Sequence, residues 1–273
     1  MYDFAYHRPK TLTDALEFLQ DEDAIPLAGG LTLVPTLKQR LAMPSALVDL
    51  NHIAELQGVQ EENGALTIGA MTTHEDMLKN EAVKRMAPAL WEAAKVTGDR
   101  QVRHRGTIGG VIANADPAAD YPATLLAHNA TVQTTAGDFA AEAFFCGLFE
   151  TPLPEGELVT GVVIPCRSAG AYEKFANPAS GYPIAGVAVA QTQAGFRVGV
   201  TGAAAHAFRW SACENWMNEN AVSGWSAEIS TAFRNAPPEL DSSAFNADIH
   251  ATPAYRASLV RTLFLRSIER FVF

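Results

Sequence analysis

The sequence of 273 residues predicts a fold of mixed helices and strands, with a domain boundary near residues 166–171. Two short apolar runs, 24–28 and 46–50, flank a Gly-Gly break and a helical pattern, which predicts a strand–loop–helix–strand unit. Asn63-Gly64 lies between two further strand-like segments and predicts a β-hairpin. After residue 170 the pattern changes to short strands and helices. These observations predict an α and β protein in two parts.

The first helix is predicted over residues 13–21, capped by Thr11 or Thr13. The apolar run at residues 24–28 predicts a short buried strand. A helical pattern then begins at Thr32. The glycines of the opening unit therefore fall at a strand-to-helix turn.

In the middle of the chain, Thr72-Thr-His-Glu75 matches a capping box and predicts a helix from about residue 73. Residues 82–96 continue the helical pattern, with Leu90, Ala93, Ala94 and Val96 as expected core positions.

Further elements are predicted from local pattern alone. We expect a helix over residues 120–127, and strands over 131–135, 158–164, 186–190 and 196–200. A helix is expected over 210–218, and a terminal helix over 253–271 carries an apolar stripe of Leu259, Leu263, Ile268 and Phe271.

Residues 105–122 are the stretch around which the chain is organised. Side-chain bulk is nearly absent from Gly109 to Ala119, so the main chain can approach a ligand closely and its N–H groups can face an anion. A shorter stretch of the same character lies at residues 27–32. Two glycine-rich loops that each bear a Thr predict two walls of one phosphate-binding site.

The first of these stretches allows two interpretations. The first N–H groups of a helix lack partners within the helix, and the helix dipole there favours negative charge, so Ala28 to Thr32 is suited to a diphosphate. Gly-Gly is equally suited to an ordinary tight turn.

The second stretch carries polar side chains of different capability. Thr107 offers a hydroxyl, Asn114 offers donors and an acceptor, and Asp120 can accept from a ribityl or ribose hydroxyl. Asp116 either contacts the ligand or fixes the loop by an Asx-turn before Pro117. No partner that would separate the pKa values of the two carboxylates is visible, so no acid–base pair is predicted.

Composition excludes several classes of protein. Asp and Glu number 30 against 20 Lys and Arg, giving a formal net charge of −10, which argues against a nucleic-acid surface. No secretory signal or membrane-spanning apolar run is seen. Cys146, Cys166 and Cys213 are far apart and predict reduced thiols in the cytoplasm, not a disulfide framework or a metal site.

Common catalytic and cofactor motifs are absent from the sequence. There is no G-x-G-x-x-G after a strand and no Walker A motif. The seven histidines show no metal-ligand spacing. Each histidine is expected to be a surface or core residue and not a ligand, and a role at the site stays open only for His104, because it adjoins the second glycine stretch.

Taken together, Pro26-Leu-Ala-Gly-Gly-Leu-Thr-Leu-Val-Pro-Thr-Leu-Lys38 and the stretch from Val102 to Pro122 resemble the FAD-binding medium subunit of molybdenum hydroxylases. This is the family of carbon monoxide dehydrogenase medium chains and the flavin domain of xanthine dehydrogenase. The resemblance implies an α+β fold. Residues 1–168 would be a PCMH-type FAD-binding module of the vanillyl-alcohol oxidase group, with subdomains at about 1–57 and 58–168. Residues 169–273 would be a small α+β C-terminal domain.

The resemblance also implies a set of FAD-binding residues and no catalytic or metal-binding residue in this chain. The implied positions are Leu27, Ala28, Gly29, Gly30, Leu31, Thr32, Leu33, Thr107, Ile108, Gly109, Gly110, Val111, Asn114, Asp120, Lys174 and Tyr182. A Cβ at Gly30 or Gly110 is expected to occupy the place of the FAD diphosphate.

The resemblance further implies partners. A small subunit would carry two [2Fe–2S] clusters and a large subunit the molybdopterin cofactor that oxidises the substrate, in a dimer of heterotrimers. Electrons would pass from molybdenum through the clusters to FAD and on to an external acceptor.

The sequence departs from the family pattern at Val111, where Asn is usual after Thr-Ile-Gly-Gly. That change removes a side-chain hydrogen bond to the cofactor. Lys174 is expected either near the flavin N1/C2 oxygen region or on the surface, and Tyr182 either over a ring face or packed elsewhere.

Three functions remain open at this point. The leading one is the FAD-binding electron-transfer subunit described above. The second is a self-sufficient flavin oxidoreductase of the vanillyl-alcohol oxidase type, for which no base or covalent flavin link is visible. The third is a structural or assembly subunit whose flavin site has decayed, with Val111 as the first sign.

Overall fold

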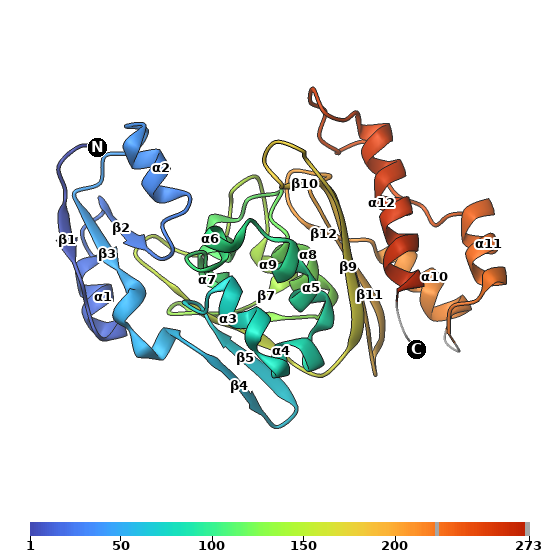
Figure 1. Cartoon of the computed structure of the whole chain (residues 1–273), viewed down its shortest axis with the longest axis horizontal. Coiled ribbons are helices and arrows are strands. Elements are labelled where there is room, and N and C mark those ends of the chain that lie inside the picture. Colours follow the sequence, from blue (N-terminus) through green and yellow to red (C-terminus); the bar gives the residue numbers. More distant parts are fainter. Residues whose placement is uncertain (222–223, 271–273) are drawn as a thin grey trace.

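The computed structural model describes residues 1–221 and 224–270, and within them three sheets follow one another along the long axis of the molecule (Figure 1). The first is parallel, with strand order β1-β3-β2. The second is antiparallel, with order β4-β5-β8-β6-β7, and the third is antiparallel, with order β12-β11-β10-β9. No helix of the described residues is long and apolar enough to cross a membrane.

The first sheet is built from β-α-β connections. Its elements are β1 (Ala5–His7), α1 (Leu12–Phe18), β2 (Ala24–Leu27), α2 (Leu33–Lys38) and β3 (Ala46–Asp49). Thr11, not Thr13, caps α1, because the Asp14 N–H donates to its hydroxyl. The strand predicted at residues 24–28 is present as β2, but the prediction that it is buried is wrong, because β2 lies at the edge of the sheet and is only half-buried.

The predicted hairpin is confirmed. It follows the short 3-10 turns η1 (Leu50–His52) and η2 (Ala54–Leu56), and it consists of β4 (Val59–Glu62) and β5 (Ala65–Gly69). Asn63 and Gly64 both have positive φ, 52° and 80°, which is the conformation that a two-residue turn between twisted strands requires.

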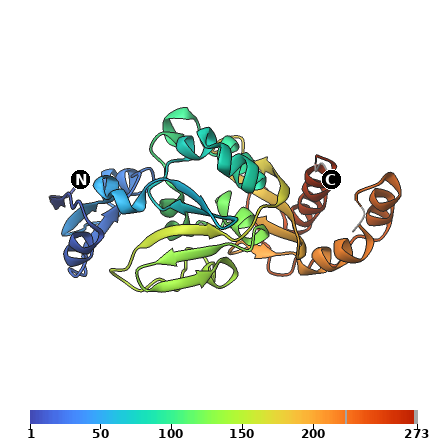
Figure 2. The same cartoon turned by 90° about the horizontal axis from the view of Figure 1, so that it is seen from below.

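The rest of the middle sheet comes from later in the chain, and helices cover it. Its other strands are β6 (Thr131–Thr134), β7 (Gly137–Ala140) and β8 (Val159–Ile164). The helices are α3 (His74–Lys79), α4 (Glu81–Met86), α5 (Pro88–Val96), α6 (Arg100–Arg103), α7 (Ile108–Asn114), α8 (Tyr121–Ala127) and α9 (Ala141–Phe144). Figure 2 shows α3 to α5 on one side of this part and the sheet on the other.

Two expectations about these helices need correction. The helix cap lies one residue later than predicted. Thr73 caps α3, since its hydroxyl accepts from the Asp76 N–H and donates to the Asp76 carboxylate, while the Thr72 hydroxyl donates to the Gly58 carbonyl. Residues 82–96 are not one helix, since α4 ends before Ala87 and Pro88 starts α5. Val96, an expected core residue, is 45% exposed.

The third sheet is covered on both faces. It consists of β9 (Ala169–Ala176), β10 (Pro183–Thr192), β11 (Gly195–Thr201) and β12 (Phe208–Arg209), and the helices α10 (Ser211–Asn220), α11 (Ala227–Asn235) and α12 (Pro253–Glu269) follow it. Along β10, Ala188 and Ala190 belong to the core shared with the middle part, whereas Val187 and Val189 belong to the C-terminal core.

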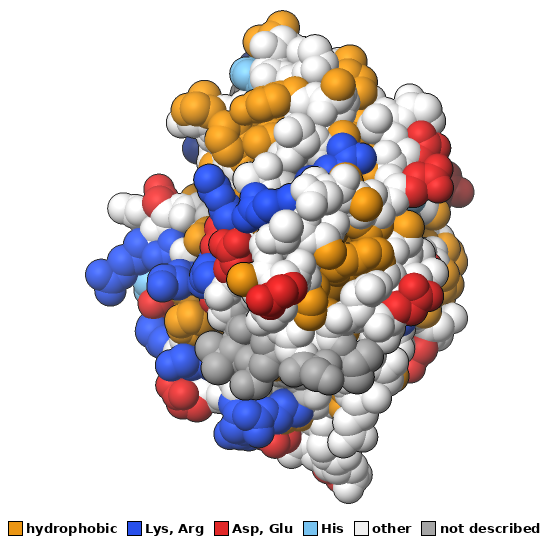
Figure 3. Space-filling view, turned by 90° about the vertical axis from the view of Figure 1, so that its right-hand side faces the viewer, with side chains coloured by type: hydrophobic (Ala, Val, Ile, Leu, Met, Phe, Trp, Pro, Cys, Tyr) orange, Lys and Arg blue, Asp and Glu red, His pale blue; other side chains and the backbone are white. Residues whose placement is uncertain are grey.

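The small residues on the inner face of this sheet allow a close approach of α8. A Cβ on Gly199 would lie 2.0 Å from the Ala123 carbonyl oxygen, so α8 packs directly on the β11 backbone. On the other face, α12 buries Leu259, Leu263 and Ile268 as predicted, while Phe271 lies outside the described residues. The outward face of the C-terminal part mixes basic, acidic and apolar side chains (Figure 3).

Candidate functional site

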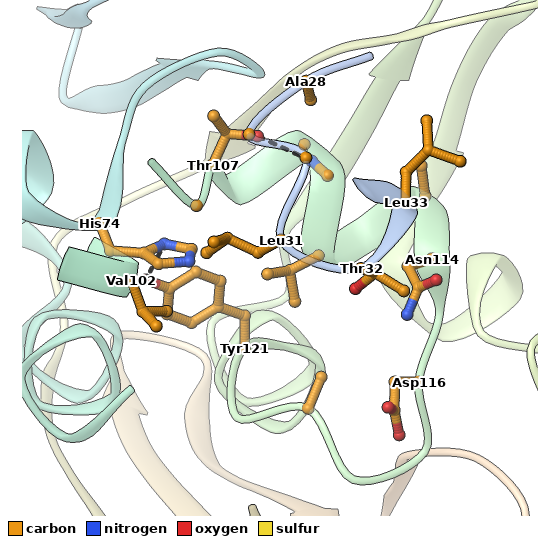
Figure 4. A pocket seen from close by; sticks show the side chains of 18 of the residues that line it. Ala28, Leu31, Thr32, Leu33, His74, Val102, Thr107, Asn114, Asp116 and Tyr121 are labelled. Atoms are coloured by element: carbon orange, nitrogen blue, oxygen red, sulfur yellow. Dashed lines mark hydrogen bonds between the residues drawn. The ribbon is translucent and has the colours of Figure 1, made fainter. Parts of the chain in front are cut away.

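A pocket of about 670 Å³ opens between the first and middle parts of the molecule. Its walls come from residues 25–36, 70–74 and 97–121, with further contributions from 158–159 and 180–182. Figure 4 shows the side chains of Ala28, Leu31, Thr32, Thr107 and Tyr121 around it. The volume lies in the range of small-molecule and cofactor sites.

The structure brings most of the predicted site residues together here. The pocket is lined by Ala28, Gly29, Gly30, Leu31, Thr32, Leu33, Thr107, Gly109, Gly110, Val111, Asn114, Asp120 and Tyr182. Leu27, Ile108 and Lys174 lie outside its lining. Leu27 ends strand β2, Ile108 is fully buried in the central core, and Lys174 turns toward Asp120.

The first glycine stretch offers free backbone donors. Within the described residues, no acceptor pairs with the N–H groups from Gly29 to Leu33, and the helical bonds of this segment begin with Val34 N donating to the Gly30 carbonyl. Gly30 has φ of 77°, a left-handed conformation that glycine adopts without strain. Successive free N–H groups ahead of a helix form a site suited to an anion such as a diphosphate.

The second stretch is a helix over α7 (Ile108–Asn114), where a loop was expected, and residues 115–120 after it are non-helical. Thr107 caps α7, and its hydroxyl accepts from the Gly110 N–H at 3.1 Å. Ile108 N donates to the Thr72 carbonyl and Gly109 N to the Ala70 carbonyl. The expectation that Gly109 and Gly110 point free backbone donors at a ligand is therefore wrong, because these groups are already paired within the chain.

The glycines of both stretches serve close packing. A Cβ on Gly29 would lie 2.1 Å from the Arg105 carbonyl oxygen, and one on Gly109 would lie 2.5 Å from the Ala70 Cβ. A Cβ on Gly30 would first meet Val34 at 3.0 Å, and one on Gly110 would first meet the Thr107 hydroxyl at 3.0 Å. Both neighbours are side chains that can shift, so packing demands glycine less strictly at residues 30 and 110 than at residue 29, and at Gly30 the positive φ is a further reason for glycine.

Asp120 forms a buried ion pair with Lys174 beside the pocket. Lys174 Nζ lies 3.0 Å from Asp120 Oδ1, and the two side chains are only 9% and 7% exposed. The hydroxyls of Tyr172 and Thr97 also donate to this carboxylate, at 2.7 and 3.2 Å. Burial raises the pKa of Asp120 above its ordinary value, although Lys174 and the two hydroxyls oppose that shift. Lys174 is therefore not the surface lysine that one interpretation expected.

Two further side chains lie at the pocket. Asp116 forms the Asx-turn, since the Ala118 N–H donates to its Oδ1 at 2.8 Å, and it also lines the pocket. Tyr182 lines the pocket while 46% exposed, so it is not packed in a core. Burial, followed by the nearby Asp116 and Asp120, raises the pKa of the Tyr182 hydroxyl.

The histidine at the pocket is His74, and the role left open for His104 is not borne out. His104 is exposed, its Nδ1 bonds the Arg100 carbonyl, and it does not line the pocket. His74 does line it, is 2% exposed, and its Nδ1 lies 2.8 Å from the Tyr121 hydroxyl (Figure 4). Burial, with a smaller contribution from the positive charge of Arg103, lowers the pKa of His74 to about 4, so its imidazole is neutral near pH 7.

Comparison with known proteins identifies the family. Residues 2–167 match the family described as the FAD binding domain in molybdopterin dehydrogenase. The chain belongs to this family. It is the FAD-binding subunit of a dehydrogenase of the molybdenum hydroxylase type, and FAD is its cofactor.

Relatives match both the sequence and the structure. The glyceraldehyde dehydrogenase medium chain of Sulfolobus acidocaldarius is 41% identical over 195 residues, 69% of each chain. The nicotine 6-hydroxylase medium subunit of Paenarthrobacter nicotinovorans is 33% identical over 274 residues, covering 96% of this chain and 95% of the relative. The solved structure of reconstituted CO dehydrogenase from Oligotropha carboxidovorans superposes with a TM-score of 0.86 at 31% identity, over 98% and 97% of the two chains.

The pocket residues of this chain fit FAD. The free N–H groups of Gly29 to Leu33 suit its diphosphate, and apolar residues such as Ile25 and Leu158 line the same pocket. When bound, FAD supplies the redox chemistry, and the protein supplies binding, orientation and electrostatics.

Proposed function

We propose that this chain is an electron-transfer subunit that passes electrons from [2Fe–2S] clusters of a small partner subunit, through FAD, to an external acceptor. The family assignment supports FAD as the carrier. The partly open pocket and the exposed Tyr182 at its wall support access of electron donors and acceptors to the cofactor.

In this proposal the residues of the chain bind and orient FAD and perform no acid–base step. Asp120 is engaged by Lys174, Tyr172 and Thr97, which leaves it little freedom to exchange a proton. The FAD-binding surface consists of the thirteen predicted residues that line the pocket, and it includes the free N–H groups of Gly29 to Leu33. Leu27, Ile108 and Lys174 then act by supporting that surface.

The partners in this proposal are a small iron–sulfur subunit and a large molybdopterin subunit that oxidises the substrate, in a dimer of heterotrimers in the cytoplasm. Relatives named as medium chains and medium subunits support such an assembly. A subunit without its own substrate chemistry would leave the choice of substrate to the large subunit.

We also propose the domain division expected from the sequence: residues 1–57 and 58–168 form the two subdomains of the FAD-binding domain, and 169–273 form the C-terminal domain. The three sheets support it, because their strands fall within residues 5–49, 59–164 and 169–209. The pocket then lies between the subdomains, with the segment 180–182 of the C-terminal domain at its wall.

The single observation that carries the proposal is the run of free N–H groups at one wall of a pocket in a chain of this family. A rapid-mixing experiment tests the transfer step. The chain with oxidised FAD is mixed with its dithionite-reduced iron–sulfur subunit, freed of excess dithionite, and the flavin absorption is followed.

Bleaching of the flavin band together with recovery of the cluster absorption is the expected result. No transfer between the two proteins would contradict the electron-transfer role. Oxidation of an organic substrate by the flavin-loaded chain alone would favour a self-sufficient oxidoreductase instead.

A further inference from the structure

The buried His74 side chain pairs with the protein through one of its two ring nitrogens. Its Nδ1 pairs with the Tyr121 hydroxyl at 2.8 Å, and the two rings meet edge to face with centroids 5.1 Å apart. Within the described residues, no hydrogen bond involves its Nε2. This nitrogen is not one of the unpartnered side-chain atoms that are shielded from solvent, so it is accessible from the pocket that His74 lines, and a polar group of a ligand can reach it there.

Neighbouring groups fix the imidazole in place. A Cβ on Gly106 would lie 2.4 Å from His74 Nε2, so the glycine of the second stretch packs directly against this nitrogen. The same Cβ would lie 3.2 Å from a methyl of Leu31, which belongs to the first stretch. Figure 4 shows the imidazole next to Leu31 and the Tyr121 ring. His74 therefore stands where both glycine-rich segments meet.

The charge state of His74 indicates which kind of ligand group its imidazole can bind. Because the pKa of the imidazole is lowered to about 4, the side chain is neutral near pH 7. A neutral nitrogen is a weak counter-charge for a phosphate but an ordinary partner for a hydroxyl, carbonyl or N–H group. The free N–H groups of Gly29 to Leu33 already provide for the diphosphate.

We infer that His74 is a cofactor-binding residue whose Nε2 forms a hydrogen bond with a neutral polar group of FAD. The inference rests on the proposed FAD site and adds to it a residue that the two glycine-rich segments do not supply. The alternative is that His74 only supports Tyr121 through Nδ1.

A pair of substitutions separates these roles, because Asn and Gln each reproduce one end of the imidazole. In His74→Asn the amide nitrogen takes the place of Nδ1 and can still meet Tyr121, but nothing stands at Nε2. In His74→Gln the amide nitrogen takes the place of Nε2. The FAD dissociation constant is measured by fluorescence titration of the apoprotein, and unfolding midpoints of the apoproteins confirm that each variant folds.

We expect His74→Asn to weaken FAD binding about tenfold and His74→Gln to stay within about threefold of the wild type, as loss and retention of one hydrogen bond predict. We expect the ratio of the His74→Asn and wild-type dissociation constants to be the same at low and high salt, because the lost contact is to a neutral group. Tyr121→Phe, which removes only the partner of Nδ1, should bind FAD more tightly than His74→Asn.

The reverse order would overturn the inference: His74→Asn binding like the wild type, with His74→Gln and Tyr121→Phe both weakened, would mean that only the Nδ1 contact matters. If the ratio of the His74→Asn and wild-type dissociation constants falls steeply with salt, the inference would also be overturned, because His74 would then contact a phosphate. These results are distinct from failure of the proposed function, in which the wild-type apoprotein itself takes up no FAD.

Discussion

Gly29 and Arg105 lie backbone to backbone: a Cβ built on the glycine would be 2.1 Å from the Arg105 carbonyl oxygen and 3.0 Å from the Gly106 Cα. This contact joins the first glycine-rich segment to the second, although they are far apart in the sequence. It holds the free N–H groups of the first segment against the wall formed by α7. The pocket therefore depends on the absence of a side chain at residue 29.

Gly29→Ala is predicted to lower the free energy of unfolding by about 1–3 kcal/mol, as overpacking against a fixed backbone does, and to weaken FAD binding. Gly110→Ala is the matched control, because its Cβ would meet the Thr107 hydroxyl at 3.0 Å, a side chain that can shift. Urea unfolding and FAD titration of both variants check this. Equal effects of the two substitutions would contradict the packing role of Gly29.

Lys174→Met is predicted to leave Asp120 buried without its counter-charge, which costs about 3–5 kcal/mol of stability near neutral pH. The pKa of Asp120 is already raised, so folding disfavours its charged form. This loss of folding free energy is complete above the folded-state pKa of Asp120 and disappears as the pH falls below its unfolded-state pKa. The difference in the free energy of unfolding between the wild type and Lys174→Met should therefore become smaller as the pH is lowered.

Urea unfolding as a function of pH measures this deficit, and adding Asp120→Asn should recover much of it. Lys79→Met removes the pair between this exposed lysine and the partly buried Glu75; it is the control and should change stability by less than about 1 kcal/mol. A Lys174→Met protein as stable as this control would mean that the ion pair contributes nothing.

Val111→Asn is predicted to tighten FAD binding by up to about tenfold, because Val111 lines the pocket and an amide there can form a hydrogen bond with the cofactor. Val111→Ala removes apolar volume without adding a polar group and should not tighten binding. Fluorescence titration of both apoproteins provides the measurement. If the Asn variant binds no better than the Ala variant, the side chain at residue 111 does not reach FAD.

His128 is predicted to make stability fall in mild acid. It is 1% exposed, and burial lowers its pKa to about 4, so the unfolded chain takes up a proton at this residue before the folded chain does. The contribution of His128 to the free energy of unfolding is complete above its unfolded-state pKa of about 6.5, and it is lost progressively as the pH falls toward about 4.

His128→Asn can keep a hydrogen bond with the Thr124 carbonyl. Between about pH 7 and pH 5, the free energy of unfolding of this variant should therefore fall by about 2 kcal/mol less than that of the wild type. Above about pH 7 the two proteins should change alike. Parallel pH profiles throughout would show that His128 does not couple folding to protonation.

Local patterns in the sequence predicted the elements that local chemistry determines. Asn63-Gly64 predicted the hairpin because its turn type depends on those two residues. The apolar stripe of α12 predicted its buried face. The paired glycine-rich segments predicted most of the pocket lining for a similar reason, since small residues near a helix start are visible without knowing the fold.

Non-local contacts decided what the sequence did not predict. The low helix propensity of glycine favoured a loop at residues 109–110, yet burial of Ile108 and Ile112 and the close fit of Gly109 on Ala70 stabilise α7. Strand β9 was not predicted, and it is the pairing of β9 with β10 that positions Lys174 to face Asp120. His74 was overlooked because its burial depends on Tyr121 and Gly106, both distant in sequence.

The most direct test of the account is the absorption spectrum of the purified chain, with the supernatant assayed for FAD after heat denaturation. The account predicts flavin bands and release of about one FAD per chain, or uptake of one equivalent when the protein is purified without it. A colourless protein that takes up no added FAD, alone or with its partner subunits, would contradict it and indicate a decayed flavin site.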